Sequence, residues 1–198
     1  MKRTAVYIHG LGGTAAEGES YRKFFSANEE LIGFDYRARS PEAAVEEFPR
    51  FFQTLGRREL VLIANSIGAY YALLSLAAVP LRKALLIAPI VDMEGLIRRR
   101  LAAGGWDEET LHRAGRIEVA DGEALSWDYL CWVRQHPIRW RQPTAILAGD
   151  RDELSPPATL GAFAAATGAR LTLMPAGEHW FHTAAQRRFR DDWLRREL

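Results

Sequence analysis

The residue of the chain best suited to chemistry is Ser66, in the stretch Ala64-Asn65-Ser66-Ile67-Gly68. A strand-like apolar run precedes it and a largely apolar, helix-like run follows it. This is the sequence form of a nucleophile elbow, a tight strand-to-helix turn in which small flanking residues prevent a collision. Such a turn pushes the hydroxyl clear of the sheet, and the first helical amides point at the same place. Taken alone, the stretch also fits a helix-capping serine after a buried strand.

Two further residues complete the set that a serine nucleophile needs. Asp152 ends the stretch Ala148-Gly149-Asp150-Arg151-Asp152, which follows a predicted strand directly. His179, in Gly177-Glu178-His179, lies between the last predicted strand and the last predicted helix. A carboxylate can accept a hydrogen bond from an imidazole, fix its tautomer and stabilise the imidazolium. A histidine on such a loop can reach across the strand ends to the serine.

The elements that must position these residues alternate between short apolar runs and longer amphipathic segments. This alternation is typical of a parallel sheet covered by helices, and so predicts an α/β fold. Several runs are continuously apolar, as expected of strands buried on both faces. The predicted strands cover residues 4–9, 31–36, 59–64, 83–88, 144–148 and 171–174.

Three helices have readable signals. Ser40-Pro41-Glu42 combines an N-cap residue, a first-turn proline and an early acid, and predicts a helix start. Ser155-Pro156-Pro157 predicts another start. In the last helix, the predicted core-facing residues are Ala185, Phe189 and Trp193.

Residues 92–141 break the alternation. They carry no good strand pattern and hold four of the six tryptophans. Gly104-Gly105 and Asp121-Gly122 are predicted turns between short helices. We interpret this segment as a helical lid inserted within one domain that spans residues 1–198.

The aromatic residues of this segment are candidates for a substrate pocket, because such sites are mostly apolar with few polar groups. Alternatively, the rings form the packed core of the lid itself. The candidates are Trp106, Trp127, Tyr129 and Trp132.

The bulk composition excludes several classes of protein. The 198 residues suit one domain. With 48% hydrophobic residues, 26% charged residues and a formal net charge of +1, the chain lacks the basic excess of a nucleic-acid binder. The single cysteine, Cys131, excludes an intrachain disulfide and a CxxC metal site.

The chain also carries no targeting pattern. No apolar run approaches the ~18 residues of a membrane span, and the N-terminal apolar run is too short for a signal peptide. We therefore expect a cytoplasmic protein that binds neither nucleic acid nor membrane. We also expect no metal and no cofactor, and the composition indicates no particular oligomeric state.

The chain resembles the α/β-hydrolases. Four segments spread over nearly its whole length carry the resemblance, and the order serine, acid, histidine is the order of that family. The segments are Ile8-His9-Gly10-Leu11-Gly12-Gly13, Asn65-Ser66-Ile67, Gly149-Asp150-Arg151-Asp152 and Gly177-Glu178-His179. Ala64 departs from the family pattern, which has glycine at that position. The resemblance also implies a trimmed sheet of about six strands, where the family usually has eight.

The resemblance implies a role for each site residue. Ser66 would be the nucleophile, Asp152 the acid and His179 the general base. The backbone N–H groups of Leu11 and Ile67 would form the oxyanion hole.

Other residues compete for these roles. Asp150, Glu153 and Asp92 are alternative acids, although a turn role suits Asp150 better. Four further histidines receive no proton-transfer role. His9 is expected to hold the oxyanion loop, His182 to lie near the start of the last helix, and His112 and His136 to lie on the lid surface.

We therefore expect a serine hydrolase that cleaves a small-molecule carboxylic ester or thioester through an acyl-enzyme on Ser66. An acyltransferase on the same triad shares every motif, and amide or carbon–carbon bond hydrolysis is also open to the family. A fold of this type that serves only for binding would be expected to lack a triad member, and this chain lacks none.

A dinucleotide-binding protein is an alternative of a different class. Gly10-Leu11-Gly12-Gly13-Thr14-Ala15 fits G-x-G-x-x-G/A after a predicted strand, and Asp35 lies at the end of the next one. That interpretation requires a helix that opens directly on the glycines, and Ala16-Glu17-Gly18-Glu19 delays it.

Overall fold

The structure, a computed structural model, describes residues 3–119 and 124–198. The predicted turn at Asp121-Gly122 lies outside these residues. The chain divides into two compact units. The larger comprises Met1–Val91 with Arg139–Leu198, and the smaller comprises Asp92–Ile138.

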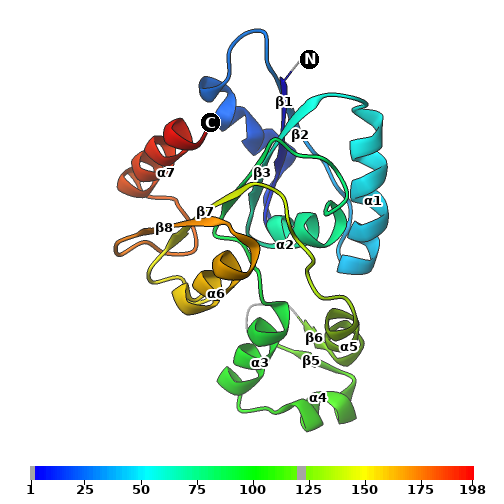
Figure 1. The fold of residues 1–198 in the computed structure, drawn as a ribbon. Helices are drawn as coiled ribbons and strands as arrows, with labels where there is room; N and C mark the ends of the chain where they lie inside the picture. The colour runs from blue at the N-terminus through cyan, green and yellow to red at the C-terminus, as the bar shows by residue number, and fades with distance from the viewer. Residues whose placement is uncertain (1–2, 120–123) are drawn as a thin grey trace. The chain divides into compact units, whose positions relative to one another are not determined.

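The larger unit contains a six-stranded parallel sheet, which confirms the predicted fold class and strand number (Figure 1). The strand order is β2-β1-β3-β4-β7-β8. The strands are β1 (Arg3–Ile8), β2 (Glu30–Gly33), β3 (Glu59–Asn65), β4 (Lys83–Ile87), β7 (Thr144–Gly149) and β8 (Arg170–Met174). The second strand is shorter than predicted and stops before Asp35, because it lies at the edge and pairs only with β1.

Five helices flank this sheet (Figure 1). They are η1 (Ala15–Phe24, a 3₁₀ helix), α1 (Pro41–Thr54), α2 (Ser66–Ser75), α6 (Pro157–Thr167) and α7 (Ala184–Glu197). The side chains of Tyr21 from η1 and Trp193 from α7 share one buried cluster with strand residues such as Tyr7 and Ile63. Helices α1 and α2 pack together on the other face of the sheet (Figure 1).

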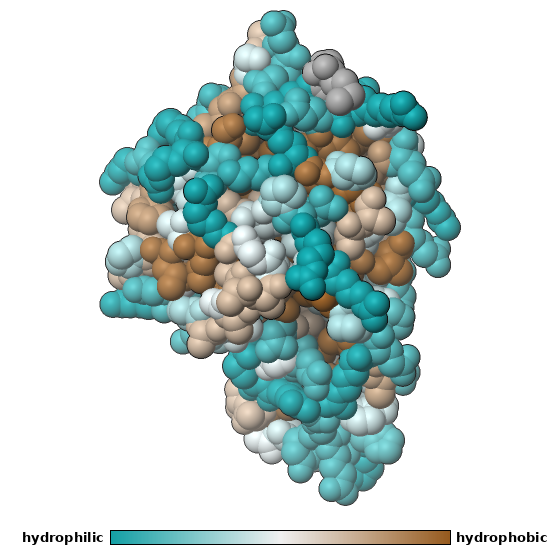
Figure 2. Space-filling view, viewed as in Figure 1, coloured by the Kyte–Doolittle hydropathy of each residue, from teal (hydrophilic) through white to brown (hydrophobic). Residues whose placement is uncertain are grey.

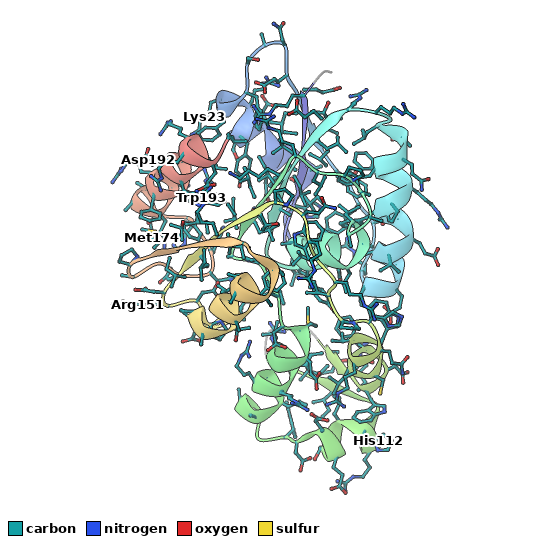
Figure 3. All side chains as sticks on the ribbon, in the orientation of Figure 1. Lys23, His112, Arg151, Met174, Asp192 and Trp193 are labelled. Atoms are coloured by element: carbon teal, nitrogen blue, oxygen red, sulfur yellow. The ribbon has the colours of Figure 1, made fainter. Side chains whose placement is uncertain are left out.

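The helix signals of the sequence operate as expected, with one exception. Ser40 Oγ accepts a hydrogen bond from Ala43 N–H at 3.4 Å, and α1 begins at Pro41. Trp193 is fully buried and points from α7 toward the sheet (Figure 3). The prediction that Ala185 faces the core is wrong, since Ala185 is exposed and its neighbour Gln186 is buried. Gln186 instead completes the capping box of α7 with Thr183.

The smaller unit contains α3 (Met93–Ala103), α4 (Glu108–Ala114) and α5 (Trp127–Gln135). The prediction of a strand-free segment is wrong, because β5 (Arg116–Glu118) and β6 (Ala124–Ser126) form an antiparallel pair. Strands of three residues are too short to produce a readable alternation. The predicted turn is present at Gly104-Gly105, where Gly104 caps α3 and Gly105 has φ +76°.

None of the described helices combines the length and the apolar character needed to cross a bilayer. On the face drawn in Figure 2, hydrophilic side chains predominate and apolar ones form separate small areas.

Candidate active site

The turn between β3 and α2 has the geometry of the predicted elbow. Ser66 is the first residue of α2, and its φ of +50° lies in the left-handed region that non-glycine residues rarely adopt. The turn leaves little space around it. Ala64 is fully buried, and a methyl group at Gly68 would lie 2.1 Å from the carbonyl oxygen of His9. The strained backbone and the tight packing therefore both occur within the stretch from Ala64 to Gly68, in which the sequence pattern predicts an elbow.

The structure brings together the three side chains predicted to act as a unit. Ser66 Oγ lies 2.7 Å from His179 Nε2, and His179 Nδ1 lies 2.8 Å from Asp152 Oδ2. An ionised carboxylate only accepts hydrogen bonds, so Nδ1–H donates to Asp152. Nε2 of the neutral ring is then the acceptor for the Ser66 hydroxyl. This arrangement can take a proton from the serine as its oxygen attacks a carbonyl carbon.

The Asp152 carboxylate is held by its own loop. Its side chain is fully buried, and Oδ1 accepts hydrogen bonds from the N–H groups of Leu154 and Ser155, both at 3.0 Å. Ser155 Oγ in turn donates to the carbonyl oxygen of Pro89 at 2.7 Å, just after β4. The second oxygen, Oδ2, is left to face His179. A buried charge needs such partners, and these fix the direction of the carboxylate.

The loops that carry Asp152 and His179 pack closely against each other at two glycines, Gly149 and Gly177. A methyl group at Gly149 would lie 2.2 Å from the main chain of Gly177, so neither strand end tolerates a larger residue at this contact. Arg151 N–H donates to the carbonyl oxygen of Gly177 at 2.9 Å. Because β8 lies at the edge of the sheet, with β4 and β7 between it and β3, this contact directs the His179 loop back toward Ser66.

The loop after β1 approaches the elbow from the other side. A methyl group at Gly10 would lie 3.2 Å from Ser66 Cβ. The carbonyl oxygen of Gly10 accepts hydrogen bonds from Gly13 N–H at 3.1 Å and from His9 Nδ1–H at 2.8 Å. Among the described residues, no acceptor pairs with the Leu11 N–H. An unpaired amide beside the serine is the kind of donor that an oxyanion hole requires.

The residues that competed for these roles have other contacts or face solvent. Asp150 and Glu153 are exposed, and Asp92 caps α3 by accepting the Gly95 N–H at 2.8 Å. His182 is exposed just before α7. His9 is buried and stacks on Tyr36 with ring centroids 4.3 Å apart.

The four predicted pocket aromatics all lie in the smaller unit, whereas Ser66, Asp152 and His179 lie in the larger one. There Trp127 packs on His112, with ring centroids 4.5 Å apart, and Trp132 stacks on His136 at 3.9 Å. Trp106 and Tyr129 are half-buried. A role for these residues in substrate binding stays a prediction.

Two features of the site have no counterpart in the sequence analysis. The Leu11 and Trp180 side chains are 69% and 75% exposed, although both are large and apolar. Leu11 follows Gly10, whose main chain approaches Ser66, and Trp180 follows His179. The second feature is a hydrogen-bonded chain behind the elbow that joins Asn65 to Tyr7 and Glu17. The residue types alone do not predict this chain, because Asn65 is far from Tyr7 and Glu17 in the sequence.

The glycine-rich loop does not have the form of a dinucleotide site. The following helix begins at Ala15, so the predicted delay over Ala16-Glu17-Gly18-Glu19 is wrong. It is, however, a 3₁₀ helix, and the Glu17 carboxylate accepts the Thr14 N–H at 3.2 Å. The negatively charged carboxylate therefore already accepts the hydrogen bond of an amide that a pyrophosphate would need. Within residues 3–119 and 124–198, no group of three or more His, Cys, Asp or Glu side chains is arranged to hold a metal ion.

Comparison with known proteins identifies the family to which this architecture corresponds. A sequence model described as the Alpha/beta hydrolase family matches residues 5–192. No curated protein matches the chain.

Among solved structures, Est1E from Butyrivibrio proteoclasticus is similar with a TM-score of 0.76 and 16% identity, covering 99% of this chain and 86% of Est1E. Mouse alpha/beta hydrolase domain-containing protein 10 has a TM-score of 0.72 and 15% identity, covering 98% and 90%. Monoacylglycerol lipase from Paleococcus ferrophilus has a TM-score of 0.67 and 16% identity, covering 98% and 95%. At these identities the likeness concerns the fold.

Proposed function

Because the chain belongs to the alpha/beta hydrolase family, we propose that it is a serine hydrolase that cleaves a carboxylic ester or thioester. The observation that carries this proposal is the continuous hydrogen-bonded line from Ser66 through His179 to the buried Asp152 carboxylate. Among the solved structures of similar fold, one is described as an esterase and another as a monoacylglycerol lipase, which also supports this reaction class.

The proposed mechanism follows from the hydrogen-bond directions. His179 Nε2 accepts the Ser66 proton while Oγ attacks the carbonyl carbon of the substrate, and Asp152 stabilises the resulting imidazolium. The N–H groups of Leu11 and Ile67 donate to the oxyanion of the tetrahedral intermediate. His179 then protonates the leaving alcohol or thiol. Water, activated by the same ring, releases the acid from the acyl-enzyme.

The substrate that we propose has an apolar acyl or aromatic group. Leu11 and Trp180 provide large apolar side chains next to the site, and such groups lose contact with water when a substrate covers them. The interpretation of residues 92–141 as an inserted lid, with aromatic residues that line the pocket, belongs to this proposal.

Hydrolysis of p-nitrophenyl esters with acyl chains of increasing length tests the proposal. Ser66→Ala should lower kcat by about 10⁶-fold, because the nucleophile is lost. Ser75→Ala is the matched control. Ser75 lies in the same helix, its buried hydroxyl has no hydrogen-bond partner among the described residues, and its removal should leave kcat within about twofold. Hydrolysis that persists in Ser66→Ala would contradict the proposal.

A further inference from the structure

A chain of hydrogen bonds runs behind the nucleophile elbow. Asn65 Nδ2–H donates to the phenol oxygen of Tyr7 at 3.0 Å. The Tyr7 hydroxyl donates to Glu17 Oε2 at 2.8 Å. Asn65 directly precedes Ser66, so the chain begins at the elbow and ends at a carboxylate.

The same carboxylate also holds the loop after β1. Glu17 Oε1 accepts the N–H of Thr14 at 3.2 Å. A methyl group at Gly13 would lie 3.0 and 3.1 Å from the two carboxylate oxygens and 3.1 Å from His9 Cβ. The loop that presents the Leu11 N–H therefore rests directly on Glu17.

The direction of every bond in the chain is determined by the chemistry of its members. Tyr7 is fully buried, and burial, reinforced by the neighbouring Tyr21 and by Glu17, raises the pKa of its phenol above the ordinary range. The phenol therefore keeps its proton and donates it to the carboxylate, which can only accept. This leaves the phenol oxygen to accept from Asn65, and so orients the Asn65 amide.

From this juxtaposition we propose that Glu17 is a positioning residue that sets the separation of the two oxyanion donors. Through Tyr7 and Asn65 it holds the elbow that carries the Ile67 N–H, and through Thr14 it holds the loop that carries the Leu11 N–H. The inference rests on the proposed function and adds to it a residue that does not touch the substrate. Stabilisation of an oxyanion depends on donors that are already in place, so a change in their separation lowers kcat.

Two substitutions break the chain at different links. Glu17→Gln replaces one of the two accepting oxygens by an NH₂ group, which faces either the Tyr7 hydroxyl or the Thr14 N–H, so one of these two hydrogen bonds is lost. Tyr7→Phe removes the phenol oxygen. Loss of an oxyanion donor costs about 10²–10³ in rate, and we expect a displaced donor to cost about 10-fold in kcat. KM should change by less than about twofold, because the ground-state contacts with the substrate remain. The double variant should be no slower than the slower single one, since both act through one chain.

The experiment compares kcat and KM for p-nitrophenyl ester hydrolysis, and Ki for phenylboronic acid, in the wild type and the variants. The boronate forms a tetrahedral adduct on a serine, so its Ki should rise about 10-fold together with the fall in kcat. Glu19→Gln is the matched control, because Glu19 is a carboxylate two residues from Glu17 and is exposed as Glu17 is, but among the described residues it bonds neither Tyr7 nor Thr14. This variant should behave as wild type. Thermal unfolding reports whether each variant is folded.

The outcomes separate this inference from the function on which it rests. If the wild type hydrolyses esters and Glu17→Gln keeps its kcat and its boronate Ki, the positioning role is overturned while the hydrolase assignment stands. A fall in kcat matched by a loss of folded protein, with Ki unchanged for the folded fraction, would also overturn it. If the wild type neither hydrolyses esters nor binds the boronate, the proposed function itself fails.

Discussion

The carbonyl oxygen of His9 and the α-carbon of Gly68 are in such close contact that a methyl group at position 68 would lie 2.1 Å from that oxygen. His9 follows β1 and Gly68 lies in the first turn of α2, so this contact fixes how near the loop after β1 can come to the turn at Ser66. Tyr36 supports the same carbonyl by donating its hydroxyl to it at 2.9 Å. The absence of a side chain at Gly68 therefore allows close packing of the loop after β1 as well as the tight turn at Ser66.

This contact predicts that Gly68→Ala is destabilising. The methyl group meets main-chain atoms that cannot move aside, so we expect a loss of about 3 kcal/mol in the free energy of unfolding. Thermal or urea unfolding measures it. Gly161→Ala in α6 is the matched control, since a methyl group there meets no atom within 4 Å. It should be stabilising by about 0.5–1 kcal/mol. Equal stabilities for the two variants would contradict the packing argument.

The proposed acid role of Asp152 can be tested by comparing substitutions of Asp152 and the neighbouring Asp150. Asp152→Asn presents either an uncharged oxygen or an NH₂ group to His179, and should lower kcat by about 10⁴-fold, because the imidazolium loses its partner. Asp150→Asn, two residues earlier and exposed, should leave kcat within about twofold. The measurement is kcat on the best p-nitrophenyl ester. The reverse order of effects would move the acid role to Asp150.

Much of this arrangement could be predicted from the sequence because its signals are local. Strands buried on both faces read as continuous apolar runs, and the elbow needs a serine between small residues. Because the strands of the predicted sheet are parallel, the carboxyl ends of β3, β7 and β8 lie at one edge.

What could not be predicted depends on contacts between distant segments or on very short elements. The hydrogen-bonded chain joins Asn65 to Glu17, which are 48 positions apart in the sequence. Taken alone, the sequence around each of these residues predicts only an ordinary strand, turn or helix. The hairpin of β5 and β6 has too few residues for a periodic pattern. Helical periodicity predicts Ala185 in the core, but the buried face of α7 begins at Gln186.

The buried phenols predict how stability depends on alkaline pH. Burial raises the pKa of Tyr7, Tyr36 and Tyr70 above their ordinary value in the folded protein. Below the unfolded pKa of about 10, both states keep these protons and their contribution to stability is complete. As pH rises above it, the unfolded state releases protons that the folded state keeps, so the free energy of unfolding falls.

Urea unfolding between pH 8 and pH 11.5 measures this dependence. Each phenol adds a slope of up to about 1.4 kcal/mol per pH unit above pH 10, and Tyr7→Phe should remove one such contribution. A free energy of unfolding that stays level up to pH 11.5 would show that the phenols ionise equally in both states.

The exposed apolar side chains at the site predict substrate preference. Trp180→Ala should lower kcat/KM for phenyl and long-chain esters by about 10-fold and should change acetate hydrolysis little, because only the larger groups bury apolar area against the ring. Val45→Ala is the control, since Val45 is an exposed apolar residue in α1. The same loss for every ester, acetate included, would indicate that Trp180 acts on His179 instead of on the substrate.

The most direct test of the central claim is covalent labelling with a fluorophosphonate, followed by intact-mass and peptide mass spectrometry. The wild type should gain a single adduct on Ser66, Ser66→Ala should gain none, and His179→Ala should react at least about 10³-fold more slowly because the hydroxyl loses its base. An unlabelled wild type, or an adduct on another residue that persists in Ser66→Ala, would contradict the assignment of Ser66 as an activated nucleophile.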